Sequence, residues 1–168
     1  TADVDGTTGL TDPWDRLAEV VAPQVLLDAV EASRRLTELG VPHALIGGLA
    51  VGLYGHPRAT KDVDFLVADQ AFERVAPILV FRTELKDMAR VGVIDFMPLP
   101  PDQPALAAFL RIPNDLEIPV ISPEGLIVLK LLADRPQDRA DIKALLQVGI
   151  DEATIADFLN RHAPGLVA

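Results

Sequence analysis

The sequence has 168 residues, 49% of them hydrophobic, and a formal net charge of -10. This length and apolar content are enough for one hydrophobic core, so we expect a single domain over residues 13–168 behind a flexible tail at residues 1–12. No apolar run is long enough to predict a membrane span, the absence of cysteine excludes disulfides and thiolate metal ligands, and the negative charge argues against nonspecific attraction to nucleic acid.

The first half of the chain predicts helices on either side of a buried strand. Residues 1–12 are small and polar and lack the regions of a signal peptide, which predicts a cytoplasmic protein. Asp12-Pro13 has the order of residues that begins a helix. The apolar spacing and the glycines then predict a helix over Pro23–Leu39 ending at Gly40, a strand over Val41–Ile46, a turn at Gly47-Gly48 and a short helix over Leu49–Tyr54.

The second half predicts further strands followed by helices. In chain order we expect a strand over Lys61–Val67, a helix over Asp69–Leu79, a strand over Val91–Met97, a loop over Pro98–Pro104 and a strand over Leu116–Ile121. Three C-terminal helices should follow, one opened by Ser122-Pro123-Glu124, one beginning near Gln137 or Asp138, and one over Asp151–Arg161. This order predicts the α/β (α+β) class, with a small mixed sheet flanked by helices.

Two aspartates in the second predicted strand are the strongest functional signal. Because strand side chains alternate between faces, Asp62 and Asp64 point to one side while Val63 and Phe65 enter the core. Two adjacent like charges are costly unless a cation or a proton lies between them, and hard oxygen ligands at this spacing suit Mg²⁺. Phosphoryl and nucleotidyl transfer use such a metal to gather triphosphate oxygens. Asp-Val-Asp alone leaves open an edge strand with two solvated aspartates.

The Gly47-Gly48 turn adds weight to the metal interpretation. It joins a predicted buried strand to a helix, where backbone amides and the helix terminus can face a triphosphate. A tight structural turn would explain the glycines equally well if the acids were absent. The three histidines show no metal-ligand spacing and receive no role.

Three segments together carry a resemblance to a known superfamily. They are Leu45–Val51, His56–Asp64 and Pro123–Ala133 with Arg139–Ile142 after it. In this order and spacing, from about Val30 to Leu146, the sequence resembles the DNA polymerase beta-like nucleotidyltransferase superfamily, and more closely its bacterial branch of AbiEii-type toxins and related small uncharacterised proteins. In that superfamily the glycine turn contacts nucleotide phosphates, the paired aspartates bind metal, and a third carboxylate on a neighbouring strand completes the site.

The resemblance implies that Asp95 is this third carboxylate. It would deprotonate the attacking hydroxyl or bind the metal. An acid embedded in an apolar strand is costly without a partner, whereas an exposed strand end would need none. Asp115 and Glu117 form a rival pair because they also alternate on a predicted strand. Asp95 is preferred because its position fits the superfamily's order.

The resemblance also implies roles for charged residues outside the three acids. Lys130 would contact a nucleotide phosphate or a catalytic acid, with Asp138 and Asp141 brought near it by the following helix. A lysine among apolar neighbours equally extends its amine to solvent. Arg58 and Lys61 could also touch phosphates, although each taken singly reads as a flanking or capping charge.

The activity that this set implies is transfer of a nucleoside monophosphate from an NTP to a hydroxyl of RNA, protein or a small molecule. Mg²⁺ would be the cofactor, with Mn²⁺ as a substitute, and pyrophosphate would leave. An antitoxin or other partner protein could complete the acceptor site, and no membrane is involved. The small size and the lack of an obvious acceptor-binding extension leave open a noncatalytic nucleotide-binding or toxin–antitoxin interaction module of the same fold.

Overall fold

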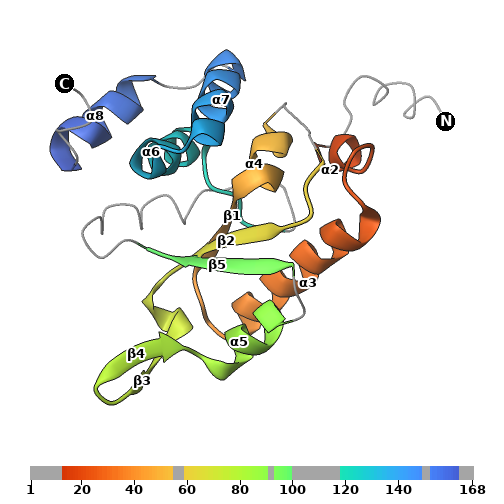
Figure 1. The fold of residues 1–168 in the computed structure, drawn as a ribbon, viewed down its shortest axis with the longest axis vertical. Helices are drawn as coiled ribbons and strands as arrows, with labels where there is room; N and C mark the ends of the chain where they lie inside the picture. The colour runs from red at the N-terminus through yellow and green to blue at the C-terminus, as the bar shows by residue number, and fades with distance from the viewer. Residues whose placement is uncertain (1–12, 55–58, 91–92, 100–117, 149–151, 163–168) are drawn as a thin grey trace, which may run out of the picture.

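The structure is a computed structural model that describes residues 13–54, 59–90, 93–99, 118–148 and 152–162. Its helices are α2 (Pro13–Leu17), α3 (Pro23–Glu38), α4 (Gly47–Leu53), α5 (Thr83–Arg90), α6 (Pro123–Ala133), α7 (Pro136–Leu145) and α8 (Glu152–His162). Its strands are β1 (His43–Ile46), β2 (Val63–Val67), β3 (Phe72–Val75), β4 (Ile78–Phe81) and β5 (Ile94–Pro98), and short 3-10 turns cover Asp69–Ala71 and Leu146–Val148. Figure 1 shows the C-terminal helices and the β3–β4 hairpin at opposite ends of the molecule.

The central sheet is mixed and has the strand order β1-β2-β5. β1 runs antiparallel to β2, whereas β2 and β5 are parallel. The segment before α6 extends this sheet at the free edge of β1 through a parallel bridge between Leu45 and Val120. There the Leu45 amide donates to the Pro119 carbonyl over 2.8 Å. A small mixed sheet flanked by helices confirms the predicted fold class.

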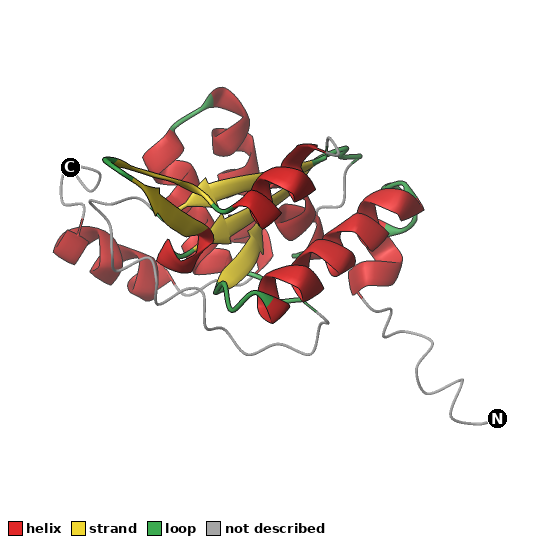
Figure 2. Cartoon of the chain, turned by 90° about the horizontal axis from the view of Figure 1, so that it is seen from below, coloured by secondary structure: helices red, strands yellow, loops and turns green. Residues whose placement is uncertain are grey.

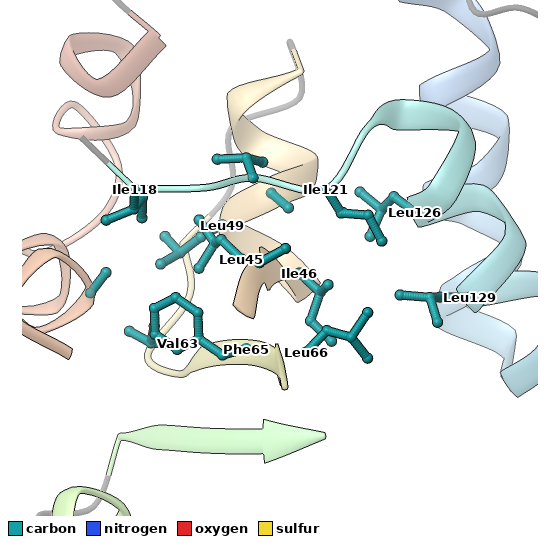
Figure 3. Close-up of a cluster of buried hydrophobic side chains, with 14 of the residues drawn as sticks. Leu45, Ile46, Leu49, Val63, Phe65, Leu66, Ile118, Ile121, Leu126 and Leu129 are labelled. Carbon is teal, nitrogen blue, oxygen red and sulfur yellow. The ribbon is translucent and has the colours of Figure 1, made fainter. Parts of the chain in front are cut away.

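The core forms where the apolar strands meet the helices on both sides of the sheet (Figure 2). All four residues of β1 are buried, and in β2 only Asp64 is not fully enclosed. α3 and α5 pack against β5, while α4 packs against β1, β2 and α6. Figure 3 shows the side chains of β1, β2, α4 and α6 meeting in one cluster. Within the described residues, no helix is long and apolar enough to cross a membrane.

The predicted helix over Asp69–Leu79 is wrong. The chain makes a 3-10 turn and then the β3–β4 hairpin, in which Phe72 and Phe81 stack with ring centroids 4.7 Å apart. Pro77 lies in the last turn of the predicted helix, past its first turn, where it would remove a helical hydrogen bond, and the β-branched residues Val75 and Ile78 near it favour strands. The helix in this region, α5, begins only at Thr83 and was not predicted.

The other boundaries of described elements agree with the prediction to within three residues, the largest difference being β5, which begins at Ile94. Two further differences concern the site and the edge of the sheet. β2 begins at Val63, so Asp62 lies just ahead of the strand and not within it. The predicted strand over Leu116–Ile121 is present only as the isolated bridge at Val120 in the part that the structure describes. Residues 116 and 117 of this strand, and most of the predicted loop after Pro98, lie outside the described residues.

One buried polar pair sits inside this framework. The Ser33 hydroxyl lies 2.7 Å from Nε2 of His43, and Nδ1 of the same ring lies 2.8 Å from the Val41 carbonyl. Both side chains are buried, and the loss of solvent lowers the pKa of His43, against the opposing effect of the Val41 hydrogen bond. Since both ring nitrogens are occupied, His43 is a satisfied core residue, as expected for a histidine without a site.

Candidate active site

The glycine turn lies directly against the paired aspartates. Ile46 is extended, and Gly47 then adopts a left-handed backbone with φ of 72° as the first residue of α4, so the glycines open the helix and do not precede it. A Cβ atom on Gly47 would lie 2.3 Å from Oδ2 of Asp64. Glycine is therefore required twice over, because a side chain would strain the backbone and would also occupy the position of the carboxylate.

Two acids occupy matched positions on neighbouring strands. Asp64 of β2 and Asp95 of β5 are register partners in the parallel pair, so both side chains project from the same face of the sheet. On the other side of Asp64, Ile46 of β1 is its partner. Asp95 is exposed and therefore does not need a partner to offset the cost of burial, as an acid embedded in an apolar strand would. Its place beside Asp64 comes from the strand register.

Two adjoining hollows open on either side of Asp64. The first, which we call the polar hollow, has a volume of about 240 Å³, and the second, the apolar hollow, has a volume of about 220 Å³. The polar hollow is lined by Gly47, Gly48, Thr60, Asp62, Asp64, Lys130, Arg135, Gln137, Asp138 and Asp141. The apolar hollow is lined by Ile46, Gly47, Asp64, Asp95, Phe96, Met97, Leu126, Leu129, Lys130, Ala133 and Arg135. Together they form one cleft with Asp64 on the boundary.

The electrostatics of the cleft centre on Asp64. Burial raises the pKa of its carboxyl, and the negative charges of Asp95 and Asp62 raise it further, to about 6. The charges of Arg135 and Lys130 act in the opposite direction without cancelling the rise. A cation bound among these acids would relieve the same repulsion that raises the pKa.

Lys130 is held inside the protein by two acids. Its Nζ donates to Oδ2 of Asp141 over 2.9 Å and to Oδ1 of Asp138 over 3.4 Å, and all three side chains are buried. Burial raises the pKa of the Asp138 carboxyl, but hydrogen bonds from the Arg135 side chain and backbone, with the charge of Lys130, outweigh it and hold the pKa below its ordinary value. The alternative that Lys130 extends its amine to solvent is therefore wrong. The positive charge of Lys130 is compensated by Asp138 and Asp141 within the protein.

Arg135 is a functional candidate that the sequence reasoning missed. It is the residue that caps α7, and it lines both hollows. A usable signal was present, because Arg135 stands before Pro136, a residue typical of the first helical position, and Asp138 follows Arg135 by three residues, the spacing of a capping interaction.

The structure thus brings together most of the predicted site residues. The members of this set that line the cleft are Gly47, Gly48, Asp62, Asp64, Asp95, Lys130, Asp138 and Asp141. Lys61 is exposed and lines neither hollow. Arg58 lies outside the described residues, as do Asp115 and Glu117.

The donor set of the cleft suits a magnesium ion that is shared with a substrate. Among the residues that the structure describes, no three acidic or histidine side chains are grouped closely enough to hold a metal ion by themselves. Mg²⁺ does not need such a cage, since it is usually bound by one or two carboxylates, several waters and substrate phosphates. Asp64 with either neighbouring acid supplies carboxylates of this kind, and the repulsion at Asp64 favours a cation there.

Comparison with known proteins identifies the family. Residues 25–153 match the family described as "Nucleotidyltransferase of unknown function (DUF6036)", which covers well over half of the chain and all the described residues of the cleft. The chain belongs to this nucleotidyltransferase family. This membership supports the predicted superfamily, whereas the closer likeness to AbiEii-type toxins stays a prediction.

Other comparisons add little beyond the family. No curated protein matches this nucleotidyltransferase-family chain. A crystal structure of an antigenic nucleotidyltransferase-like protein from Paracoccidioides brasiliensis is similar, with a TM-score of 0.45 and 17% identity over 88% of this chain and 92% of that chain.

The contact between Gly47 and Asp64 gives a testable prediction. We expect Gly47→Ala to lower the free energy of unfolding by about 1–3 kcal/mol, because the left-handed backbone is strained and the new methyl must displace the Asp64 carboxylate. Any nucleotidyl transfer should fall by about 100-fold, since the displaced acid leaves its productive position. Urea unfolding and a turnover assay measure the two effects.

Gly40→Ala is the matched control. Gly40 has the same φ of 72°, but a Cβ atom there would have no other atom within 4 Å. It should show the backbone strain alone, with turnover unchanged. If Gly47→Ala behaved like Gly40→Ala in both assays, close packing against Asp64 would have no functional meaning.

Proposed function

We propose that this chain transfers a nucleoside monophosphate from an NTP to a hydroxyl of RNA, protein or a small molecule, with Mg²⁺ or Mn²⁺ held by its aspartates. One observation carries the proposal: Asp64 and Asp95 lie at the same register on adjacent parallel strands, and Asp64 packs against the Gly47 turn. Membership of a nucleotidyltransferase family supports it.

In this proposal each hollow binds a different substrate. The triphosphate binds in the polar hollow, where Gly47 and Gly48 begin a helix whose backbone amides favour anions. Asp62 and Asp64 hold the metal, whose charge when bound draws the phosphate oxygens together and offsets the charge that develops on them. Asp64 also separates the nucleotide side from the acceptor side.

Asp95 would act on the acceptor hydroxyl. It lines the apolar hollow and is exposed, so a hydroxyl entering there could give its proton to the carboxylate. The freed oxygen then bonds to the α-phosphorus, the bond from that phosphorus to the bridging oxygen breaks, and pyrophosphate leaves. The apolar walls formed by Phe96, Leu126 and Leu129 favour an acceptor, or part of one, with a flat or apolar face.

The test is transfer of label from each NTP in turn. Purified protein is incubated with an α-³²P-labelled NTP, Mg²⁺ or Mn²⁺ and a cell extract that supplies RNA, proteins and small molecules. We expect labelled product from at least one NTP and no product from an Asp62→Asn, Asp64→Asn variant. Folded wild-type protein that labels nothing under all these conditions would contradict the proposal.

Two further measurements distinguish the alternative function. NTP binding without pyrophosphate release, measured by calorimetry and a pyrophosphate assay, would favour a noncatalytic nucleotide-binding or toxin–antitoxin interaction module. An antitoxin or other partner protein and a cytoplasmic location remain predictions from the resemblance and the composition, and co-purification from the native host tests the first of them.

A further inference from the structure

Arg135 is held at the border of both hollows with its charge exposed. It lines the polar hollow together with Asp62 and the apolar hollow together with Asp95. Its side chain is 72% exposed, although the carboxylate that it contacts is only 1% exposed. The guanidinium therefore sits where a ligand can reach it, while its anchor is inside the protein.

The anchor fixes the orientation of this guanidinium. Nε donates to Oδ2 of Asp138 over 2.8 Å, and Nη2 donates to Oδ1 over 3.1 Å. The Arg135 backbone amide donates to the same Oδ2 over 3.0 Å. Two parallel bonds of this kind set the plane of the group, and they use two of the five N–H donors that a guanidinium carries. A long side chain fixed in this way loses less freedom when it binds a ligand.

Lys130 is poorly suited to the same role. It contacts both Asp138 and Asp141, and only 7% of its side chain is exposed. Recruiting it to a phosphate would mean pulling it from two buried carboxylates, which is costly. Arg135 shares one of these carboxylates but is open to solvent.

The cleft needs an accessible cation of this kind. Asp62, Asp64 and Asp95 line it and repel any phosphate that enters. A bound Mg²⁺ offsets part of this charge, but a triphosphate adds several negative charges of its own. Among the described residues that line both hollows, Arg135 is the basic residue with an exposed side chain.

On the basis of the proposed function, we propose that Arg135 is a nucleotide-binding residue that contacts the triphosphate through its guanidinium, that Asp138 positions it, and that Lys130 serves to hold Asp138 and Asp141 in place. Planar guanidinium groups fit phosphate oxygens in a two-pronged geometry that an ammonium cannot match. Arg135, and not Lys130, then supplies the charge that distinguishes an NTP from its nucleoside.

The experiment measures binding of a nonhydrolysable NTP, and of the matching nucleoside, to the folded chain with Mg²⁺ by calorimetry. The NTP is chosen as the one that labels best in the transfer assay, or as the tightest binder of the four if none labels. The variants are Arg135→Gln, Arg135→Lys and, as the matched control, Arg139→Gln. Arg139 donates through the same two atoms to exposed Asp134, at 3.3 Å each, has a side chain 74% exposed, and lines neither hollow.

We expect Arg135→Gln to weaken NTP binding by about 10- to 100-fold, the scale of a lost charge-assisted contact, while nucleoside binding stays within error. Its melting temperature should fall, because buried Asp138 loses two side-chain donors and keeps the amide of residue 135 and Lys130, so binding is measured well below that temperature. Arg135→Lys should recover part of the affinity, and Arg139→Gln should bind like the wild type. Equal NTP affinity in Arg135→Gln and wild type would overturn the inference and leave the proposed function standing. An equal loss for NTP and nucleoside would also overturn it, because it would indicate a structural effect. A wild-type protein that binds no NTP would overturn both.

Discussion

Asp64→Asn is expected to abolish nucleotidyl transfer and, in the same protein, to increase the stability of the metal-free fold. The two effects have one cause. Burial in the cleft is the largest cause of the raised pKa of Asp64, and the charges of Asp95 and Asp62 raise that pKa further. This concentration of negative charge serves a cation, and without the cation it destabilises the folded state.

The size of the stability gain follows from the pKa. The carboxyl titrates at about 6 when folded, compared with an ordinary value of 3.8. Each pKa unit corresponds to about 1.4 kcal/mol, and allowing for solvent screening in an open cleft we expect a gain of about 1–2 kcal/mol at pH 7.5. The neutral amide keeps the shape of the side chain, so the fold should be retained.

The pH dependence has a definite sign. Between pH 3.8 and about 6 the folded protein holds a proton on Asp64 that the unfolded chain has released. The penalty from Asp64 is therefore complete above about pH 6 and declines as the pH falls towards 3.8. The stability difference between Asp64→Asn and wild type should be largest at pH 7.5 and smaller at pH 4.5.

Urea unfolding in EDTA at the two pH values measures this difference, and the labelling assay measures transfer, which should fall by at least about 1,000-fold. Asp157→Asn removes an exposed carboxylate on α8 that lines neither hollow, and it should change neither quantity. If Asp64→Asn were less stable than wild type at pH 7.5, the acids would not be repelling one another. If it retained full turnover, Asp64 would not belong to the reaction centre.

The sequence was sufficient to predict the two strands that carry Asp64 and Asp95 and their order along the chain. Asp64 could be placed because alternation along a strand and the buried neighbours Val63 and Phe65 fix the face to which it points. That Asp95 lies beside it could be proposed only from the resemblance, since pairing between β2 and β5 depends on segments some thirty residues apart along the chain. Local patterns do not determine such a register.

Other features depended on the tertiary structure in ways that local patterns do not reveal. Asp69–Leu79 has enough apolar residues for a helix, but Pro77 and the Phe72–Phe81 stack favour a hairpin. For Lys130 the resemblance implied contact with a nucleotide phosphate or a catalytic acid, with Asp138 and Asp141 nearby, and the local pattern equally allowed an amine extended to solvent. Both acids do lie at Lys130, but the sequence did not show that they hold its amine inside the protein. Two acids on the next helix, at 8 and 11 residues along the chain, keep it inside.

The charge cluster around Lys130 should be essential for stability. Lys130→Met keeps the length of the side chain but removes the ammonium that Asp138 and Asp141 both contact. Removing one partner from a buried charge cluster typically costs about 3–5 kcal/mol, because the remaining charges stay away from water. We expect a loss of this size in the free energy of unfolding, a large part of the stability of an ordinary domain.

Three further variants decide whether this loss comes from the charges. Lys143→Met changes an exposed lysine on the same helix as Asp141 and should alter stability by less than about 0.5 kcal/mol. Lys130→Met with Asp141→Asn should recover part of the loss, because it removes one of the two buried negative charges while Asp138 keeps its bonds to Arg135. Asp141→Asn alone should destabilise, since Asp138 at 3.4 Å is then the one charged partner that Lys130 keeps among the contacts described above. These are the signs of a double-mutant cycle with coupled charges. A double mutant that was less stable than Lys130→Met would mean that Asp141 is stabilised mainly by other contacts, such as the bond from Gln137, and the assignment of Lys130 as the residue that holds Asp138 and Asp141 would have to be given up.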